Sequence, residues 1–574
     1  MKLPFIEDRG TGILAYDSEF EVSKKHPPFD IPVPMNLQSA FEGLYKGIET
    51  YSFSKRNINV RETHFENTLQ CITTNGNMGD IIQKNDFTFN IPPFFEEGLR
   101  PEDTPPPSIY DAWAVYSIGS NDYEINENTI DFIGFSVPAQ SGGGGIGDGG
   151  GGVEPPFFKP NYYGIIVNNT AGGGMVNENE FNVASNFNSE FVENLTGTQT
   201  EENNKSVEMG CNIYHNFESE QEWLINPISP NDNPNFENRL DDQGSGCGSD
   251  PQTGDPLPAG NLFQNNCGNS EANIRVGFLD AGFEYWANGL PGSESYPDCS
   301  STNGIGIFEC QPDNQLAHEV MCPAGNSGSG GIGKAMVNSN SPTGIAAELN
   351  NGNYDETEKT LLTTAVYKIY EEAEQESDAI VFLEAMNTHH SNSILMKKYL
   401  NKGLLLEAQN KLNALHGGGV YDASYIQFYQ LLIDVQVSGR KYTELTALEL
   451  QTAENIAQAN TYGSVYAESL LAMLNQTTVD RIPHKESMQG NKRALENTEQ
   501  DFSVYPNPSK DFVVIESNTA TAKLLIYDIT GLLIEVHDIQ QNKQQVPLNL
   551  SVGTYILQLH SATGILSKKI VVMD

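Results

Sequence analysis

Short apolar strands alternate with a recurring polar corner from residue 10 to about residue 270. The repeated pattern is apolar-x-x-Asn-x-apolar, centred on Asn85, Asn128, Asn179 and Asn212, with Thr63 in the Asn place of an earlier copy. Thr63 and Asn85 are 22 residues apart, and Asn85 and Asn128 are 43 apart, which is close to two such steps. A period near 22 with short strands is typical of a right-handed parallel β-helix, whose coils stack on one another.

The recurring Asn has a structural explanation. An Asn at a bend can hydrogen-bond its own backbone and the side-chain amides of stacked neighbours, and Thr can replace it. We therefore interpret these positions as a structural ladder rather than a ligand site: Thr63, Asn85, Asn128, Asn179 and Asn212. Asn261 begins a partial further copy, and a glycine-rich run at 141–152 predicts a loop inserted between coils.

The pattern changes three times between residues 270 and 500. Residues 271–353 are irregular and rich in Asn, Asp, Pro, Gly and Ser, and from Pro323 to Asn353 they indicate a linker. Residues 354–476 keep apolar residues at helical spacing and are broken by glycines, so they predict antiparallel helical hairpins. One stretch, Tyr399 to Leu412, resembles a degenerate tetratricopeptide unit. Residues 477–500 are polar and predict a second linker.

The last segment, residues 501–574, predicts a small all-β domain. Leu524 to Tyr527 and Leu532 to Val536 flank a turn that contains Gly531, which is the pattern of a hairpin. Thr554 to Leu559 and Lys568 to Val572 predict another hairpin. Six or seven strands in about seventy residues suit a minimal β-sandwich.

A set of motif residues is spread along this tail: Tyr505, Pro506, Asn507, Pro508, Gly531, Gly553, Tyr555, Lys568 and Lys569. Together they resemble the type A C-terminal sorting domain of the type IX secretion system of Bacteroidota. The resemblance implies recognition by the type IX secretion machinery and removal of the tail by its sortase-like peptidase. It also implies a protein that is secreted, or held at the outer membrane surface by attachment to lipopolysaccharide.

Composition narrows the partners. The chain has 32 Lys+Arg against 75 Asp+Glu, a formal net charge of −43. Such an acidic surface repels phosphate backbones, so we expect no nucleic-acid partner. The sequence has no apolar run long enough for a transmembrane helix.

Seven cysteines are consistent with an exported protein. We expect disulfides within the cluster of Cys247, Cys267, Cys299, Cys310 and Cys322. The odd total leaves at least one thiol unpaired, and Cys71 or Cys211 would pack as a small apolar residue. No spacing suits zinc, and the loop carboxylates around Asp241 do not keep a calcium-loop spacing, although calcium stays possible.

The N-terminus has no apolar segment of the kind found in export signals. A type IX substrate must first cross the inner membrane, and the first repeat begins close to Gly10, which leaves no room for a cap on the coils. We therefore expect Met1 to lie within a longer protein.

Function is less clearly indicated than architecture. Pectate-lyase-like β-helices include lyases and hydrolases, which need paired carboxylates or calcium with a basic residue. The polar residues near the ladder form no diagnostic pair: His64, Asp86, Glu127, Glu178, Glu180 and His215. His389 and His390 are expected to be a solvated pair at a helix boundary. We assign no catalytic, cofactor or metal residue and expect a surface binding or adhesion protein with glycan or protein partners. A polysaccharide lyase, a glycoside hydrolase and a passive stalk are the alternatives.

Overall fold

The computed structural model divides the chain into two compact units. One contains residues 1–95 and 105–487, and the other contains residues 96–104 and 488–574. The structure describes residues 11–23, 39–54, 56–90, 111–133, 161–170, 172–184, 187, 194–217, 221–225, 239–240, 243, 259–263, 272–276, 283–287, 297, 305–309, 328–352, 354–416, 421–459, 461–475, 477, 483, 502–505, 509–510, 512–517, 522–528, 533–539, 543–548, 550–551, 553–561 and 564–572.

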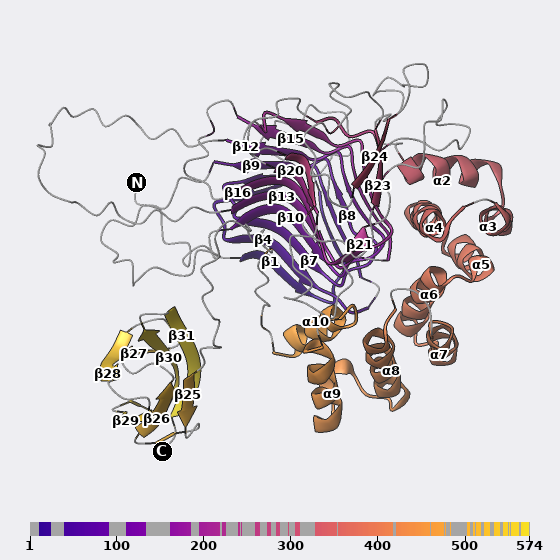
Figure 1. Cartoon of the computed structure of the whole chain (residues 1–574). Coiled ribbons are helices and arrows are strands. Elements are labelled where there is room, and N and C mark those ends of the chain that lie inside the picture. The colour runs from indigo at the N-terminus through magenta and orange to yellow at the C-terminus, as the bar shows by residue number, and fades with distance from the viewer. Residues whose placement is uncertain are drawn as a thin grey trace, which may run out of the picture. The chain divides into compact units, whose positions relative to one another are not determined.

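Three long parallel sheets dominate the first unit (Figure 1). Sheet A consists of β1 (Thr11–Tyr16), β4 (Lys46–Tyr51), β7 (Gln70–Asn75), β10 (Ala112–Ile118), β13 (Asn161–Asn168), β16 (Asn194–Glu201), β20 (Gln221–Ile225) and β22 (Ala272–Val276). Sheet B consists of β2 (Phe20–Val22), β5 (Ile58–Arg61), β8 (Ile81–Gln83), β11 (Tyr123–Asn126), β14 (Gly174–Asn177) and β18 (Val207–Gly210). Sheet C consists of β3 (Ser39–Glu42), β6 (Thr63–Glu66), β9 (Asp86–Phe89), β12 (Thr129–Phe132), β15 (Glu180–Val183) and β19 (Ile213–His215).

Successive strands visit the three sheets in turn, so the chain winds as a stack of coils. The strand β7 in sheet A is followed by β8 in sheet B and β9 in sheet C, and β10, β11 and β12 then pair with them in parallel. This arrangement is consistent with the parallel β-helix that the repeat predicts, and we call it the solenoid. Two short parallel pairs accompany it: β17 (Asn203–Asn204) with β21 (Arg239–Leu240), and β23 (Phe283–Ala287) with β24 (Ile305–Glu309).

Stacked aromatic rings fill the inside of the solenoid. Phe65 of sheet C lies between Phe41 and Phe87, with both pairs of ring centroids 4.9 Å apart. Farther along, the centroids of Phe181 and Tyr214 are also 4.9 Å apart. A Cβ on Gly164 of sheet A would lie 2.5 Å from the Phe181 ring, so this glycine makes room for the aromatic stack. Sheet A therefore forms the wall opposite the rings at this coil.

Helices follow the solenoid strands in the same unit. The described residues include nine α-helices: α2 (Gly328–Ser339), α3 (Pro342–Asn351), α4 (Glu356–Glu372), α5 (Glu376–Met386), α6 (His389–Asn401), α7 (Leu405–Asn413), α8 (Ala423–Val437), α9 (Ala447–Ala457) and α10 (Ser464–Asn475). A short 3-10 helix, η7 (Tyr442–Glu444), lies between α8 and α9.

The expectation that Pro323 to Asn353 is a linker is wrong for the described part of that segment, where α2 and α3 lie. Ser341 caps α3, Pro342 occupies its first turn, and Ile345 and Leu349 are buried. A proline at the first helical position has no amide hydrogen to lose, so the Ser-Pro start favours a helix. Sheet A also continues past residue 270 into β22.

The second unit contains two antiparallel sheets. One consists of β25 (Phe502–Tyr505), β26 (Phe512–Ser517) and β29 (Lys543–Pro547), and the other has the order β28 (Leu533–Ile539), β27 (Ala522–Asp528), β30 (Gly553–Ser561) and β31 (Gly564–Val572). Buried side chains from both sheets form one apolar cluster. The two expected hairpins are present, because β27 pairs with β28 and β30 pairs with β31.

Candidate functional site

The side chains of the repeated Asn residues form a continuous chain of hydrogen bonds inside the solenoid. The amide nitrogens of Thr63 and Asn85 donate to the Oδ1 atoms of Asn85 and Asn128 at 3.0 Å each. The amide nitrogen of Asn128 donates to Asn179 at 3.2 Å, and that of Asn179 to Asn212 at 3.1 Å. Each of these five side chains is almost fully buried. This burial indicates a structural rather than a ligand-binding role.

The residue before each ladder position has a positive φ. Glu62, Lys84, Glu127, Glu178 and Cys211 have φ between 48° and 58°. This left-handed conformation turns the chain sharply between sheets B and C, and it costs a non-glycine residue roughly 1 kcal/mol. Glu127 accepts from the Gln83 amide at 2.6 Å, and its carboxylate lies 3.4 Å from the Lys84 Nζ. Glu127 and Glu178 are therefore corner residues of the coils.

The other polar residues named from the sequence lie on the outer face of sheet C. The register places His64 beside Asp86, and Glu180 lies on a strand adjacent to His215. His64 Nε2 lies 3.7 Å from a Glu66 oxygen, and His215 Nε2 lies 3.5 Å from a Glu180 oxygen. These contacts form a partly exposed polar face on the solenoid. Among the described residues, no cluster of three or more His, Cys, Asp or Glu residues could hold a metal ion.

The cysteines are only partly described. Cys71 is a free, buried thiol whose pKa burial raises. Cys211 is disulfide-bonded. The predicted disulfide residues lie outside the described residues, so their pairing stays a prediction: Cys247, Cys267, Cys299, Cys310 and Cys322.

A buried polar interface joins the helices to the corner of the solenoid between sheets A and B. The Nε2 atom of His390 lies 2.9 Å from the Oδ1 of Asp122, which also accepts from the Thr364 hydroxyl at 2.6 Å. The Nδ1 of His390 lies 3.2 Å from the hydroxyl of Tyr421. His390 is 6% exposed, so the expectation of a solvated pair is wrong for it, whereas His389 is exposed at the helix start. The His390 ring is buried because it contacts the carboxylate of Asp122, which is far away in the sequence.

Helix α10 docks on the same corner. The Nδ2 of Asn121 donates to the Tyr466 hydroxyl at 2.7 Å, and that hydroxyl donates to the Gly119 carbonyl oxygen at 2.9 Å. Gly119 has a φ of +58°, and a Cβ there would lie 2.8 Å from Val465 of α10. Only glycine combines this backbone conformation with such a close helix.

Lys397 lies within this interface without a hydrogen-bond acceptor among the described residues. It is fully buried, and its Nζ lies 4.5, 5.6 and 5.8 Å from the ring centroids of Tyr466, Tyr429 and Tyr425. Burial lowers the pKa of Lys397 to about 7, and the Asp122 carboxylate opposes the shift. The rings supply cation–π attraction in place of water.

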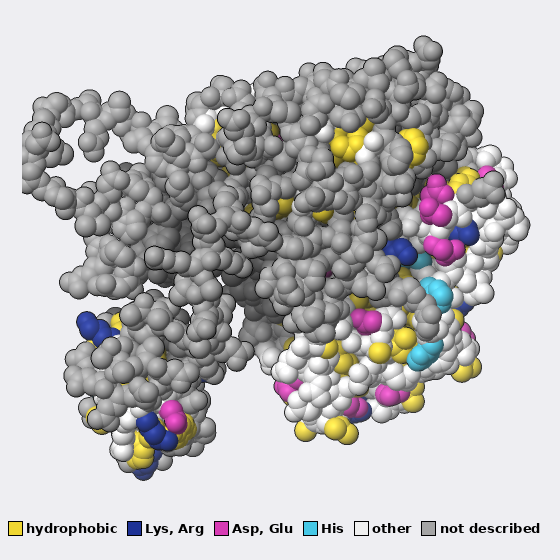
Figure 2. All heavy atoms as spheres, viewed as in Figure 1, with side chains coloured by type: hydrophobic (Ala, Val, Ile, Leu, Met, Phe, Trp, Pro, Cys, Tyr) yellow, Lys and Arg dark blue, Asp and Glu magenta, His cyan; other side chains and the backbone are white. Residues whose placement is uncertain are grey.

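An open groove of about 770 Å³ lies between α8 and α9, and we call it the α8–α9 groove. Its lining residues are His416, Tyr421, Asp422, Ala423, Ile426, Gln427, Gln430, Leu431, Asp434, Leu448, Glu449 and Thr452. The volume is in the range of known ligand pockets. Figure 2 shows apolar and acidic side chains close together on the surface of the helical region.

The groove has apolar and acidic components. Ile426 and Leu431 project from α8, and Leu448 of α9 is 77% exposed at the rim. Three of its lining residues are acidic, and none of the described lining residues is Lys or Arg. Asp434 is exposed and accepts from the Gln430 amide at 2.9 Å. The groove therefore offers an apolar contact with acidic residues at its rim.

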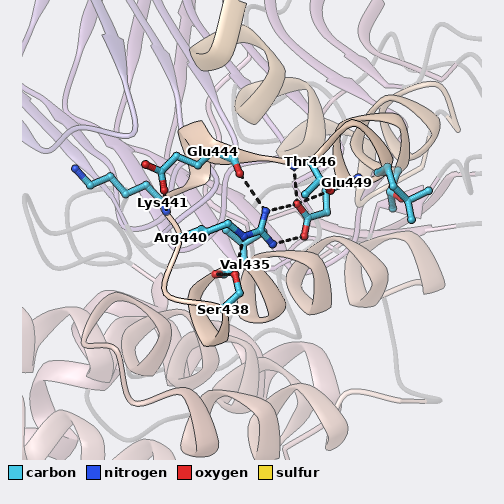
Figure 3. Close-up of polar contacts among 9 residues, drawn as sticks. Val435, Ser438, Arg440, Lys441, Glu444, Thr446 and Glu449 are labelled. Atoms are coloured by element: carbon cyan, nitrogen blue, oxygen red, sulfur yellow. Dashed lines mark hydrogen bonds and ion pairs between the residues drawn. The ribbon is translucent and has the colours of Figure 1, made fainter.

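A charged brace fixes the wall of this groove (Figure 3). The Arg440 guanidinium donates to both oxygens of Glu449, at 2.7 and 2.6 Å, and Glu449 also accepts from the Thr446 amide at 2.7 Å. These bonds, with that of Arg440 first, lower the pKa of Glu449 to about 2. The bidentate contact sets where α9 begins relative to the end of α8. Sequence periodicity gave no signal for it.

The sorting motif is partly described. Tyr505 donates from its hydroxyl to Glu516 at 2.5 Å, and the Lys543 Nζ lies 5.2 Å from the Tyr505 ring centroid. The Tyr555 hydroxyl donates to the Ser551 carbonyl oxygen at 2.9 Å. Gly553 lies in β30, and Lys568 and Lys569 lie in β31. The remaining motif residues lie outside the described residues: Pro506, Asn507, Pro508 and Gly531.

Comparison with known proteins identifies this tail. A family model described as a secretion system C-terminal sorting domain matches residues 503–573. The tail is thus a type IX sorting domain, which implies contact with that secretion machinery, export, and a protein that is secreted or at the cell surface. No curated protein and no solved structure matches the chain. None of the described helices is long and apolar enough to cross a membrane.

Proposed function

We propose that this chain is an exported binding protein whose ligand is a cationic, partly apolar peptide segment held in the α8–α9 groove. The observation that carries the proposal is the groove itself, with its exposed Leu448 and the acidic residues Asp422, Asp434 and Glu449. An apolar side chain of the ligand would cover Leu448, and Lys or Arg side chains would approach the acidic rim. In this proposal the solenoid is a right-handed β-helix that serves as a rigid support.

The brace gives the site a fixed shape before the ligand arrives. Arg440 holds Glu449 in one position, so little side-chain entropy remains to be lost there on binding. Because the pKa of Glu449 is lowered to about 2, its carboxylate stays ionised and paired with Arg440 at physiological pH, so the attraction for a cationic ligand falls to Asp422 and Asp434. Asp434 is the carboxylate left most open to a ligand.

A peptide titration tests the proposal on the full chain. Two twelve-residue peptides with the same apolar residues, one with Lys and one with Glu at the polar positions, would be compared by calorimetry. We expect the Lys peptide to bind at least about tenfold more tightly, with affinity falling as salt rises. Leu448→Asp should lower the affinity for the Lys peptide by removing the apolar contact, even though the new carboxylate adds negative charge to the rim. Leu406→Asp, at a position 72% exposed on α7 and outside the groove, is the matched control.

Equal affinity for the two peptides, or unchanged binding by the Leu448→Asp chain, would contradict the proposal. A fall of the same size in the Leu406→Asp control would point to a general effect of added charge. Tight binding of the Lys peptide by the wild-type chain and the Leu406→Asp control, but not by the Leu448→Asp chain, would support the proposal.

A second candidate is glycan binding on the outer face of sheet C. The polar side chains there repeat from coil to coil, at about the 4.8 Å spacing of neighbouring strands. An extended polysaccharide could follow such columns without turnover. Binding of the chain on a glycan array, lost on His64→Ala with Asp86→Ala, would support this candidate; release of sugar fragments would favour a lyase or hydrolase instead.

In either case we propose that the tail is removed on export and that the mature chain is anchored through lipopolysaccharide or released.

A further inference from the structure

The sorting domain has four sheet edges, and three of them carry features that discourage contact. Strand β29 ends at the exposed Pro547, which has no amide hydrogen. Strand β25 has only four residues and is followed in the sequence by two prolines. An isolated parallel bridge joins Val572 of β31 to Ser509. Short strands, prolines and covered edges are the usual ways in which proteins block edge contacts.

The fourth edge strand, β28, has the reverse of the usual side-chain pattern. Its register pairs Glu535 with Ile526 and His537 with Leu524, and both of these β27 residues are fully buried in the core. The polar residues Glu535 and His537 of β28 thus share the core-facing side of the sheet. Ile534 and Val536 face outward and are 42% and 52% exposed. A strand of an isolated sheet normally has its apolar residues inside and its polar residues outside.

The inward polar side chains of β28 contact each other. His537 Nε2 lies 2.9 Å from a Glu535 oxygen, and the two side chains are 24% and 17% exposed. The pair therefore needs no partner protein. The outward side differs, because Val536 pairs across the sheet with the half-buried Leu525, and together with Ile534 they extend an apolar patch over two strands.

We propose that this patch, Leu525, Ile534 and Val536, is the surface by which the type IX secretion machinery recognises the sorting domain, through an apolar protein surface of its own. The occupant follows from the identity of the domain, since a sorting domain must contact that machinery to act. An exposed apolar patch lowers the solubility of a domain, so its presence is explained when a partner protein covers it. This inference rests on the sorting domain and is independent of the α8–α9 groove.

Export of the full chain, placed behind a signal peptide for the inner membrane, by a bacterium with a type IX system tests the proposal. Val536→Lys would place a charge in the patch and should reduce the ratio of exported to periplasmic chain at least about tenfold. Phe512→Lys is the matched control, because Phe512 is 38% exposed on the other sheet. We expect it to change that ratio less than about twofold. Export of the Val536→Lys chain at the wild-type level, or an equal loss in the control, would overturn the proposal.

A second measurement covers the case in which Val536→Lys fails to fold. A photoreactive amino acid would replace Ile534 in one full chain and Phe512 in another, and cross-linked products would be identified by mass spectrometry. We expect a protein of the secretion machinery to be linked from position 534 and not from position 512. No such product from position 534 in an exported chain, or equal linkage from both positions, would overturn the assignment.

Discussion

The solenoid interior and the interface between solenoid and helices bury polar groups in opposite ways. In the ladder, each Asn side chain repeats the role of the one before it, and neutral amides satisfy one another from Asn85 to Asn261. At the interface, polar and charged groups meet in contacts that do not repeat, such as that of His390 with Asp122, and Lys397 has no hydrogen-bond acceptor among the described residues. A repeated neutral network stabilises the fold, whereas a single buried charge costs stability unless it is paired.

Removing one rung should have the largest effect in this comparison. Asn128→Ala leaves the buried amide of Asn85 without its acceptor and the Ile82 carbonyl oxygen without its donor. We expect a loss of about 3 kcal/mol in the free energy of unfolding, because buried groups lose their hydrogen bonds. Denaturant unfolding measures it. Asn182→Ala, on the partly exposed face of sheet C, is the control and should cost less than about 1 kcal/mol. Equal losses would mean that the ladder is no more important than a surface amide.

Replacing the buried amine should stabilise the protein. Lys397→Met keeps the length of the side chain and removes a charge whose pKa falls from 10.5 to about 7 on burial. The protonated amine opposes folding below pH 7, and this penalty disappears as the pH rises from 7 to 10.5. We expect the Met variant to be more stable by about 2 kcal/mol at pH 6 and to lose this advantage toward pH 10. Thermal unfolding at both pH values checks the sign, and a less stable variant at pH 6 would show that the Tyr rings compensate the charge.

The smallest effect is expected at Asp80, a buried carboxylate at the same corner. Burial raises the pKa of Asp80 from 3.8 to about 6, against hydrogen bonds from Ile58 and Asn77 and the charge of Lys368. The folded state binds the proton more tightly, so stability falls as the pH rises from 3.8 to 6. Asp80→Asn keeps the acceptor for the Ile58 amide and should flatten this dependence, with a gain of about 1 kcal/mol at pH 7. An unchanged pH profile would place the titration in another group.

The ladder inside the solenoid is predictable from the sequence and the interface between solenoid and helices is not, for a physical reason. A ladder requires the same residue at the same corner of every coil, so the period of Thr63, Asn85 and Asn128 is visible in one chain. The β27–β28 and β30–β31 hairpins are predictable from the alternation of apolar and polar residues and from the turn residues between the strands. The contact of Asp122 with His390 joins residues with no shared period, as does the Arg440 brace of the groove. The sequence does not predict α2 and α3, because glycine and asparagine have low helix propensity. Tertiary packing stabilises these short helices instead.

Hydrogen exchange of the full chain with and without the Lys peptide tests the central claim, that the α8–α9 groove is the binding site. The amides of α8 (Ala423–Val437) and α9 (Ala447–Ala457) should gain protection on binding, while those of sheet C stay unchanged. Protection confined to the strands of sheet C, or none in α8 and α9 at saturating peptide, would contradict the claim.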